Sequence, residues 1–571
     1  MSSLTKALDS MQLGEKNHIE LRWHNSSFEE LLTQFYFQLV RTKDMNDLYS
    51  KFNTLLMTED LDKLILLAKL TLHVRDMNGK GERDLPYMML LAWWNKRPEL
   101  AYYIFETMML SKNVSQPYAS WKDVKYLCKY IKNVTKDQEH PFINWLVELT
   151  NHHLKIDWDN LITKKNTQVS LLGKWVPREK SQFAWLFSKL VKNMFARYYE
   201  TAKTNDKKKA ADRKARKEYR LICSTLNKWL DTIQIKQCEK KWSSIDPNKV
   251  TSITFSKQKQ ALFNQKMVNG KLVERHDNDD DRKICKEHFV EYLNSKKEKK
   301  ETIKGKRVSI YDFVKDAIKY ERIEGDDVQL MKETINSQWE NNSKQNFRLN
   351  NMIALVDTSG SMETDNCQPL YNAIGLGIRI SEKTSAAFRD RVLTFSANPT
   401  WVKLDEEKTF CDKVAKVRKA EWGMNTDIYK AFELILSAIQ RAKLPAEEVE
   451  NLTLVILSDM QIDNSCQGEW SSGTLFEGIK KLFQDRGLEI CGRPYNTPNI
   501  LFWNLRKTNG FPTQTTENNV TMLSGFNPLL LNVLCEKGFD ELKNCTPYLM
   551  LMEMLIVDRY DAINEIRNIM L

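Results

Sequence analysis

Two apolar segments that each run into an aspartate constrain the fold of this 571-residue chain more than any other feature. Residues 351–356 (NMIALV) lead into Asp357, and residues 452–458 (LTLVILS) lead into Asp459. Short, continuously apolar runs are typical of strands that are buried on both faces of a parallel sheet. Strands and helical patterns alternate here, which predicts a doubly wound α/β domain over residues 345–571. Two further segments fit strands of the same sheet: 391–396 and 499–504.

Oxygen-bearing side chains follow these strands, at the edge where the carboxyl ends of parallel strands meet. Two serines come directly after the first strand, and a threonine lies in the loop W-G-M-N-T-D that enters a later helical pattern. Hard divalent cations prefer such oxygen ligands, and two carboxylates would offset the charge of the ion. We therefore predict a site for Mg²⁺, with Ca²⁺ or Mn²⁺ as alternatives, whose last position is filled by water or by an acidic residue of a partner protein. Its predicted ligands are Asp357, Ser359, Ser361, Thr426 and Asp459.

The preceding part of the chain has the spacing of amphipathic helices instead. Apolar residues recur every three or four positions in six segments: 28–39, 61–72, 87–94, 101–109, 121–131 and 142–154. Short helices joined by short turns predict a helical-repeat, HEAT-like body over residues 25–344, after an N-terminal tail at 1–24. A single irregular helical bundle remains the alternative. The polar segment 336–346 is predicted to be a linker or a capped helix end at the boundary.

Charge divides the chain at the same place. Residues 1–344 hold 62 Lys and Arg against 46 Asp and Glu, and residues 345–571 hold 24 against 29, so the net charges are +16 and −5. A basic body favours a polyanionic partner, of which nucleic acid is the commonest. Basic side chains are dense at 203–220 and 296–307, and the segment 173–180 is followed by aromatic residues at 183–199 that could stack on unpaired bases. The alternative is that the charges form a solvated helix face or loop and that the aromatic residues belong to the core. The candidate nucleic-acid-binding residues are Lys174, Arg178, Lys180, Lys207, Lys208, Lys209, Arg213 and Lys214.

Several features narrow the class of protein further. The segment 75–83 (RDMNGKGER) lacks the spacing of a phosphate-binding loop, and we interpret it as a turn that ties neighbouring helices together through its charged residues. No two cysteines are spaced C-x-x-C, and no apolar run approaches the ~20 residues of a membrane span. No secretory signal is visible at the N-terminus. We expect a cytoplasmic protein without membrane contact, or a virion protein if the source is a large DNA virus.

The order of the oxygen donors resembles that of the von Willebrand factor A domain. The D-x-S-x-S motif of its metal-ion-dependent adhesion site stands here as Asp357-Thr-Ser359-Gly-Ser361, and the family's later Thr and Asp match Thr426 and Asp459. A basic helical body before such a domain is similar to the TROVE/Ro-type RNA-binding proteins, and more closely to an uncharacterised relative of that family from plants, fungi and large DNA viruses. The segments that carry this second resemblance are 75–83, 174–178 (KWVPR) and 241–250 (KWSSIDPNKV).

The resemblance implies a non-catalytic scaffold for structured or misfolded RNA, with a metal site that stabilises the body or recruits an acidic partner. A second hypothesis is a metal-dependent protein-interaction adaptor that does not bind RNA. A third is a metal-assisted phosphatase or nuclease, which needs a general base or a second metal. No histidine occurs after His288, so no Ser-His-Asp arrangement can form within the C-terminal domain. We therefore expect no enzymatic activity and no catalytic residues.

Overall fold

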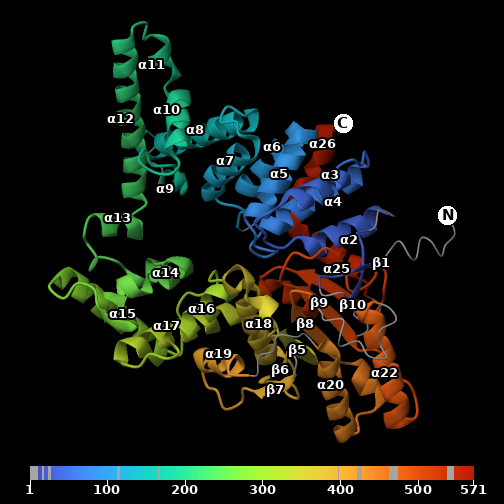
Figure 1. Ribbon diagram of the computed structural model, residues 1–571. Helices are drawn as coiled ribbons and strands as arrows, with labels where there is room; N and C mark the ends of the chain where they lie inside the picture. Colours follow the sequence, from blue (N-terminus) through green and yellow to red (C-terminus); the bar gives the residue numbers. More distant parts are fainter. Residues whose placement is uncertain are drawn as a thin grey trace.

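The computed structural model describes residues 11–15, 18–23, 27–111, 116–163, 168–396, 398–420, 427–461, 474–536 and 545–570. Its N-terminal part is largely helical, and its C-terminal part is built on a six-stranded, mostly parallel sheet (Figure 1). No helix in the described ranges is both long enough and apolar enough to span a bilayer.

Helices account for almost all of the regular structure before the sheet, and the six predicted helical segments are confirmed. The side chains of Ser27, Asp60 and His140 cap the helices that follow them. Pro98 and Pro141 each open a helix at its first position, where a missing N–H costs nothing. The helices are α2 (Phe28–Gln38), α3 (Asn46–Leu55), α4 (Leu61–Arg75), α5 (Asp84–Lys96), α6 (Pro98–Leu110), α7 (Trp121–Thr135), α8 (Pro141–Ile162), α9 (Leu172–Trp175), α10 (Ala184–Met194), α11 (Ala196–Glu200), α12 (Asn205–Trp229), α13 (Ile233–Cys238), α14 (Ser252–Leu262), α15 (Asp280–Glu298), α16 (Ile310–Tyr320) and α17 (Asp326–Ser343).

The sheet has the strand order β10-β9-β8-β5-β6-β7, and only β7 runs antiparallel to its neighbour. The four predicted strands are confirmed as β5, β6, β8 and β9, whereas β7 and β10 were not predicted. The segment 336–346 belongs mainly to the end of α17, so the helix-end alternative is correct. The strands are β5 (Met352–Asp357), β6 (Arg391–Phe395), β7 (Thr400–Lys403), β8 (Thr453–Ser458), β9 (Asn499–Asn504) and β10 (Val520–Ser524).

Alternate strand residues enter two separate cores, as the two-residue period of a strand requires. Ile353 and Leu355 pack on one face with the helices α20 (Ile428–Ala442) and α22 (Leu475–Cys491). Ala354 and Val356 pack on the other face with α18 (Thr364–Lys383). That second core is continuous with the core of the helical part, so the two parts of the chain share one hydrophobic interior.

Both ends of the helical part pack against the sheet part. At its beginning, α2 contacts β10 and α25 (Pro547–Leu555), and α4 contacts the 3-10 segment η6 (Asp558–Glu565). At its end, α16 and α17 contact α19 (Phe410–Arg418), and α16 also packs on α18. The helices between these ends lead away from the sheet through α7–α12 and return through α13–α15 (Figure 1). The helical part therefore describes a circuit that the sheet part closes.

Lys80 joins three segments at the first of these seams. Its buried ammonium donates hydrogen bonds to the carbonyl oxygens of Tyr36 (2.8 Å) and Leu39 (2.9 Å) at the end of α2. It also donates to the hydroxyl of Ser524 at the end of β10. Burial lowers the pKa of Lys80 well below its ordinary value. A cation at the carboxyl end of a helix satisfies carbonyl groups that have no partner inside the helix.

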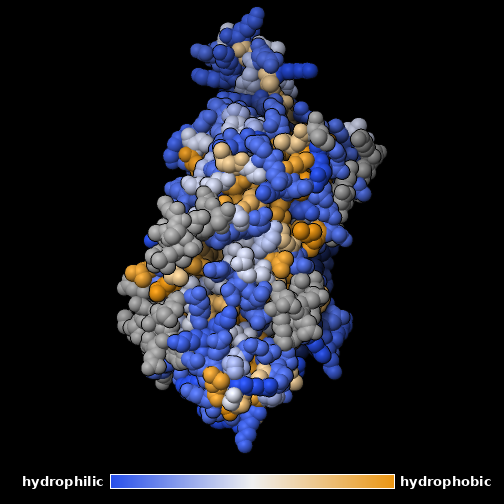
Figure 2. All heavy atoms as spheres, turned by 90° about the vertical axis from the view of Figure 1, so that its right-hand side faces the viewer, coloured by the Kyte–Doolittle hydropathy of each residue, from blue (hydrophilic) through white to orange (hydrophobic). Residues whose placement is uncertain are grey.

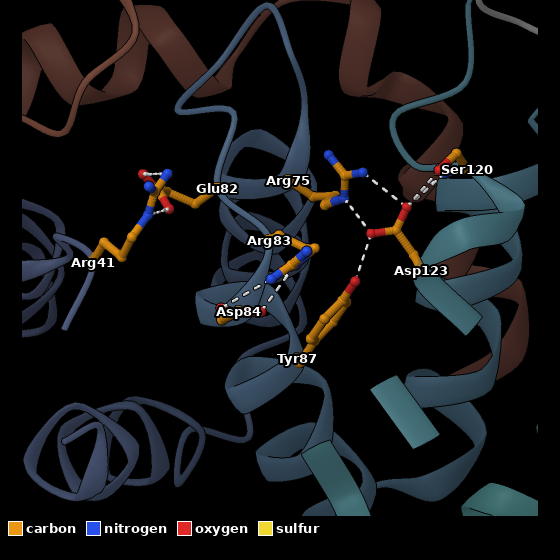
Figure 3. A network of polar contacts seen from close by, with 8 residues as sticks. All are labelled: Arg41, Arg75, Glu82, Arg83, Asp84, Tyr87, Ser120 and Asp123. Atoms are coloured by element: carbon orange, nitrogen blue, oxygen red, sulfur yellow. Dashed lines mark hydrogen bonds and ion pairs between the residues drawn. The ribbon is translucent and has the colours of Figure 1, made fainter. Parts of the chain in front are cut away.

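The segment 75–83 forms the turn between α4 and α5, as predicted, and its charged residues tie several helices together (Figure 3). The Arg75 guanidinium donates two hydrogen bonds to the Asp123 carboxylate of α7, at 2.9 and 2.8 Å. Tyr87 and Ser120 donate to the same carboxylate. Burial would raise the pKa of Asp123, but these partners, Arg75 first among them, lower it below its ordinary value. Arg41 of the segment after α2 pairs with Glu82 at 3.0 Å.

Two short strands lie within the segment predicted as an N-terminal tail. Strands β1 (Met11–Leu13) and β2 (Ile19–Leu21) pair as an antiparallel hairpin, and Leu21 exchanges two backbone hydrogen bonds of 3.0 Å with Phe511 of the sheet part. A second small hairpin joins β3 (Gln265–Val268) and β4 (Lys271–Glu274) in the helical part. The N-terminal hairpin thus adds a third contact with the sheet part, beside those made by the two ends of the helical part.

Candidate metal and nucleic-acid sites

The predicted metal ligands lie at the carboxyl edge of the sheet, where β5 and β8 run side by side. Asp357 ends β5, and Asp459 directly follows β8. Ser359 and Ser361 lie in the turn after β5, where the 3-10 segment η2 (Gly360–Glu363) begins. Because β5 and β8 are parallel neighbours in register, their ends bring the two aspartates to the same place. Thr426 lies outside the described residues.

Hydrogen bonds connect these side chains directly. The hydroxyls of Ser359 and Ser361 are 3.0 Å apart, and Ser361 donates to Asp459 Oδ1 at 3.2 Å. Asp357 accepts from the backbone N–H of Ser359 at 2.9 Å and from the Ser458 hydroxyl at 2.6 Å. Four of the five predicted ligands are therefore within one cluster, and Ser458 is an additional member that the sequence prediction missed.

The cluster is buried and negatively charged. Asp357, Ser359 and Asp459 have no exposed surface. Burial and the neighbouring Asp459 carboxylate raise the pKa of Asp357 to about 7. Arg506 Nη1 lies 3.6 Å from Asp459 Oδ2 and offsets part of this charge. Within the described ranges, no group of three His, Cys, Asp or Glu side chains could hold a metal, so a site here depends on the serine hydroxyls. Two carboxylates and two hydroxyls are a donor set that suits a hard divalent cation.

A basic surface that the sequence prediction missed lies on α7. Lys122, Lys125, Lys129 and Lys132 are spaced by three and four residues, so they share one side of the helix. We call these four lysines the α7 basic face. Among the described residues, none of the four has a carboxylate within ion-pair distance. Burial, with Lys122 and Arg178 nearby, lowers the pKa of Lys125 to about 8.

Aromatic rings from α9, from the turn before α10 and from α10 itself lie beside the α7 basic face. The Lys122 and Lys125 ammonium groups lie 5.5 and 5.0 Å from the Trp175 ring centroid. Lys132 lies 4.6 Å from the centroid of Trp185, and Lys129 lies 5.8 Å from that of Phe183. The Trp175 and Trp185 rings are half-buried, and cations beside such rings can contact phosphates while the rings contact unpaired bases.

The candidate nucleic-acid-binding residues fall into two groups. Lys174 is over the Trp175 ring, 5.4 Å from its centroid, and Arg178 is close enough to lower the pKa of Lys125, so both belong beside the α7 basic face. Lys180 is exposed five residues after Trp175. The others are exposed on α12, whose first turns project with α11 as a mainly hydrophilic tip at the top of Figures 1 and 2. These are Lys207, Lys208, Lys209, Arg213 and Lys214.

The aromatic residues after Pro177 divide between core and surface. Phe183 and Phe187 are buried, with 4 and 2% of their surfaces exposed. Tyr198 and Tyr199 are half-buried and donate hydrogen bonds to Glu218 and Asp212 of α12. The interpretation of these aromatics as core residues therefore holds for the two phenylalanines.

Comparisons with known proteins found a family model for the sheet part and a viral relative for most of the chain. Residues 351–555 match a family model described as "Domain of unknown function (DUF7788)". "Uncharacterized protein L728" of Acanthamoeba polyphaga mimivirus is 26% identical over 537 residues, which cover 92% of this chain and 85% of that protein. This relative confirms the predicted resemblance to an uncharacterised protein of a large DNA virus.

Among solved structures, the RO (RSR) protein of Deinococcus radiodurans matches with a TM-score of 0.36 and 12% identity, over 93% of this chain and 99% of that chain. The family model covers the sheet part of the chain.

Proposed function

We propose that this protein is a non-catalytic RNA-binding scaffold, in which a HEAT-like helical body contacts RNA and a von Willebrand factor A-like domain binds a divalent cation. The α7 basic face carries this proposal. Four lysines without carboxylate partners among the described residues lie beside the half-buried rings of Trp175 and Trp185. Lysines that are not neutralised within the protein are available to displace the counterions of a phosphate backbone. The resemblance to Ro-type proteins supports RNA, structured or misfolded, as the polyanion.

The test is the salt dependence of RNA binding. We expect the full chain to bind a fluorescein-labelled, partly single-stranded RNA at 50 mM KCl, as measured by fluorescence anisotropy. With about five phosphates contacted, affinity should fall about 100-fold between 50 and 200 mM KCl. Dextran sulfate, a polyanion that is not a nucleic acid, serves as a competitor and shows how much of the binding depends on charge alone. A change in affinity of less than about threefold over this range, or no binding at 50 mM KCl, would contradict the proposal.

The sheet edge is proposed to hold one Mg²⁺, with Ca²⁺ or Mn²⁺ as alternatives, through Asp357, Ser359, Ser361, Thr426 and Asp459. The hydrogen-bonded cluster of two carboxylates and two serine hydroxyls supports this assignment. The ion would reduce the repulsion between the two aspartates and would leave one coordination position for water or for a carboxylate of an acidic partner protein. The alternative function is a protein-interaction adaptor that binds such an acidic partner and no RNA. In that case, removal of the metal with EDTA would abolish binding of the partner protein.

Removal of a ligand should remove stabilisation by metal. At a Mg²⁺ concentration about 100 times its Kd, we expect the wild-type protein to gain about 2.7 kcal/mol in unfolding free energy. Ser359→Ala and Asp357→Ala should lose most of this gain and keep the fold, as measured by thermal unfolding with Mg²⁺ and with EDTA. Ser224→Ala, which changes an exposed serine of α12, is the matched control. An unchanged response to Mg²⁺ in both site variants would exclude these residues as ligands.

A further inference from the structure

The N-terminal hairpin lies against the sheet edge that carries the metal cluster. Leu21 of β2 pairs with Phe511 of the sheet part, and a cavity of about 240 Å³ lies between the hairpin and the end of β8. The hairpin contributes Glu15 to the wall of this cavity, and the segment after β8 contributes Asp459 and Gln461. A carboxylate from the beginning of the chain is therefore beside one of the predicted metal ligands.

Arg506 connects the Glu15 carboxylate with that of Asp459. Its Nη1 atom lies 3.4 Å from Glu15 Oε2 and 3.6 Å from Asp459 Oδ2, so these two oxygens are within about 7 Å of each other. The side-chain amide of Gln461 also donates to Glu15 Oε2. Two oxygen ligands on opposite sides of a divalent cation are about 4–5 Å apart. A rotamer change of the Glu15 side chain is enough to close the remaining distance to an ion bound at Asp459.

The present partners of Glu15 hold it only weakly. Its side chain is 46% exposed and that of Arg506 is 30% exposed, and an ion pair at such a surface contributes little. A divalent cation at the buried cluster would attract the Glu15 carboxylate and repel the Arg506 guanidinium. Glu15 would then exchange the guanidinium for the ion.

The hairpin itself is small enough to respond to such a contact. Its two strands have three residues each, and an isolated two-stranded hairpin is marginally stable at best. Gly14 donates its backbone N–H to the carbonyl oxygen of His18 at 2.7 Å, which fixes the turn that carries Glu15. The position of the hairpin therefore depends on its contacts with the sheet part, and a bond from Glu15 to an ion would add to them.

We propose that Glu15 is a further ligand of the divalent cation, so that the N-terminal hairpin closes the metal site. Glu15 takes the coordination position that a carboxylate of a partner protein would otherwise fill, and such a partner has to displace it. Because coupling between two binding events is reciprocal, the ion holds the hairpin as much as the hairpin holds the ion. This inference rests on the proposed metal site.

The affinity for Mn²⁺ tests the role of Glu15. Free Mn²⁺ is measured by electron paramagnetic resonance during titration of the full chain. Glu15→Gln keeps the size of the side chain and should weaken binding about tenfold or more, because a ligand carboxylate is lost. Glu447→Gln is the matched control: this glutamate of α21 (Ala446–Glu450) pairs with Arg493 at 2.8 Å, is 68% exposed and precedes β8. Its affinity should change less than twofold.

The two proposals fail separately in this titration. Binding that Asp357→Ala abolishes and Glu15→Gln leaves unchanged would overturn the role of Glu15 and keep the metal site. An equal loss in Glu15→Gln and Glu447→Gln would show an effect of net charge and would also overturn it. No Mn²⁺ binding by the wild-type protein would overturn both proposals.

Hydrogen exchange tests the closure of the site by the hairpin. With saturating Mg²⁺, the backbone amides of β2 (Ile19–Leu21) should exchange about tenfold more slowly in the wild-type protein than with EDTA. In Glu15→Gln the two rates should differ less than twofold. An equal slowing by Mg²⁺ in both proteins would show that Glu15 does not link the ion to the hairpin.

Acetate tests whether Glu15 occupies the position of an external carboxylate. In Glu15→Gln, 100 mM acetate should raise the affinity for Mn²⁺ about threefold or more relative to 100 mM chloride. In the wild-type protein the same exchange of anions should have almost no effect, because Glu15 already fills the position. The same response to acetate in both proteins would overturn the competition between Glu15 and a partner carboxylate.

Discussion

Replacement of Lys122, Lys129 and Lys132 by glutamate should weaken RNA binding about 100- to 1000-fold at 100 mM KCl. Each lysine that neutralises a phosphate contributes about one unit to the dependence of log affinity on log salt, so the slope should also fall by about two to three units. Lys125 is left unchanged because its ammonium also donates to the carbonyl oxygen of Trp175 at 3.2 Å. Anisotropy titrations from 50 to 200 mM KCl measure both quantities.

Two triple variants with the same change in charge serve as comparisons. Lys403, Lys408 and Lys443 are exposed lysines of the sheet part, and their replacement by glutamate should change affinity less than threefold. Lys207, Lys208 and Lys209 lie at the projecting tip of α12, and their reversal is also predicted to weaken binding and lower the salt slope. If the sheet-part variant weakens binding as much as the α7 variant, the effect is one of net charge, and the α7 basic face is not the interface.

Asp123→Ala should lower the unfolding free energy of the helical part by about 3–5 kcal/mol. The substitution leaves the Arg75 guanidinium, whose side chain is only 12% exposed, without its partner in the interior. A buried charge that loses its partner costs far more than the pair itself contributes. The hydroxyls of Tyr87 and Ser120 lose their acceptor in the same step. Urea denaturation followed by circular dichroism at the helix band measures the loss.

Two controls separate this effect from the loss of an ordinary ion pair. Glu59→Ala breaks a pair with Arg97 in which the glutamate side chain is 86% exposed, and we expect a change of less than about 1 kcal/mol. The double variant Arg75→Met with Asp123→Leu removes both charges and should recover much of the stability. A double variant as unstable as Asp123→Ala would show that the buried charge is not the cause.

The metal cluster could be predicted from sequence because its geometry follows from strand pairing. Buried parallel strands give continuous apolar runs in the sequence. The residue after each run lies at the carboxyl edge of the sheet, and this position does not depend on how the connecting helices pack. Asp357 and Asp459 are 102 positions apart and were still expected to meet. Ser458 was missed because a serine at the end of a strand has no signature of its own; only its place before Asp459 could have indicated it.

The α7 basic face could not be predicted in the same way. Its lysines are spread over eleven positions among apolar residues, so they do not form a dense run in the sequence, unlike the lysines of residues 203–220. The rings beside them come from Trp175, Phe183 and Trp185, which follow α7 by some forty to sixty positions. The packing of the helices brings the lysines and the rings together, and no local pattern in the sequence indicates which helices pack against each other. The circuit closed by the sheet part depends on packing for the same reason.

The anchoring of both ends of the helical part has a consequence for a broken chain. Because α2 and α4 hold to the sheet part through β10, α25 and η6, and α16 and α17 hold to it through α18 and α19, one cut in the connection after α12 frees neither end. The N-terminal fragment would keep its apolar interface with β10, α25 and η6 of the C-terminal fragment, and the two fragments would elute together as one particle. Tolerance of a single proteolytic nick is therefore built into the way this molecule is assembled.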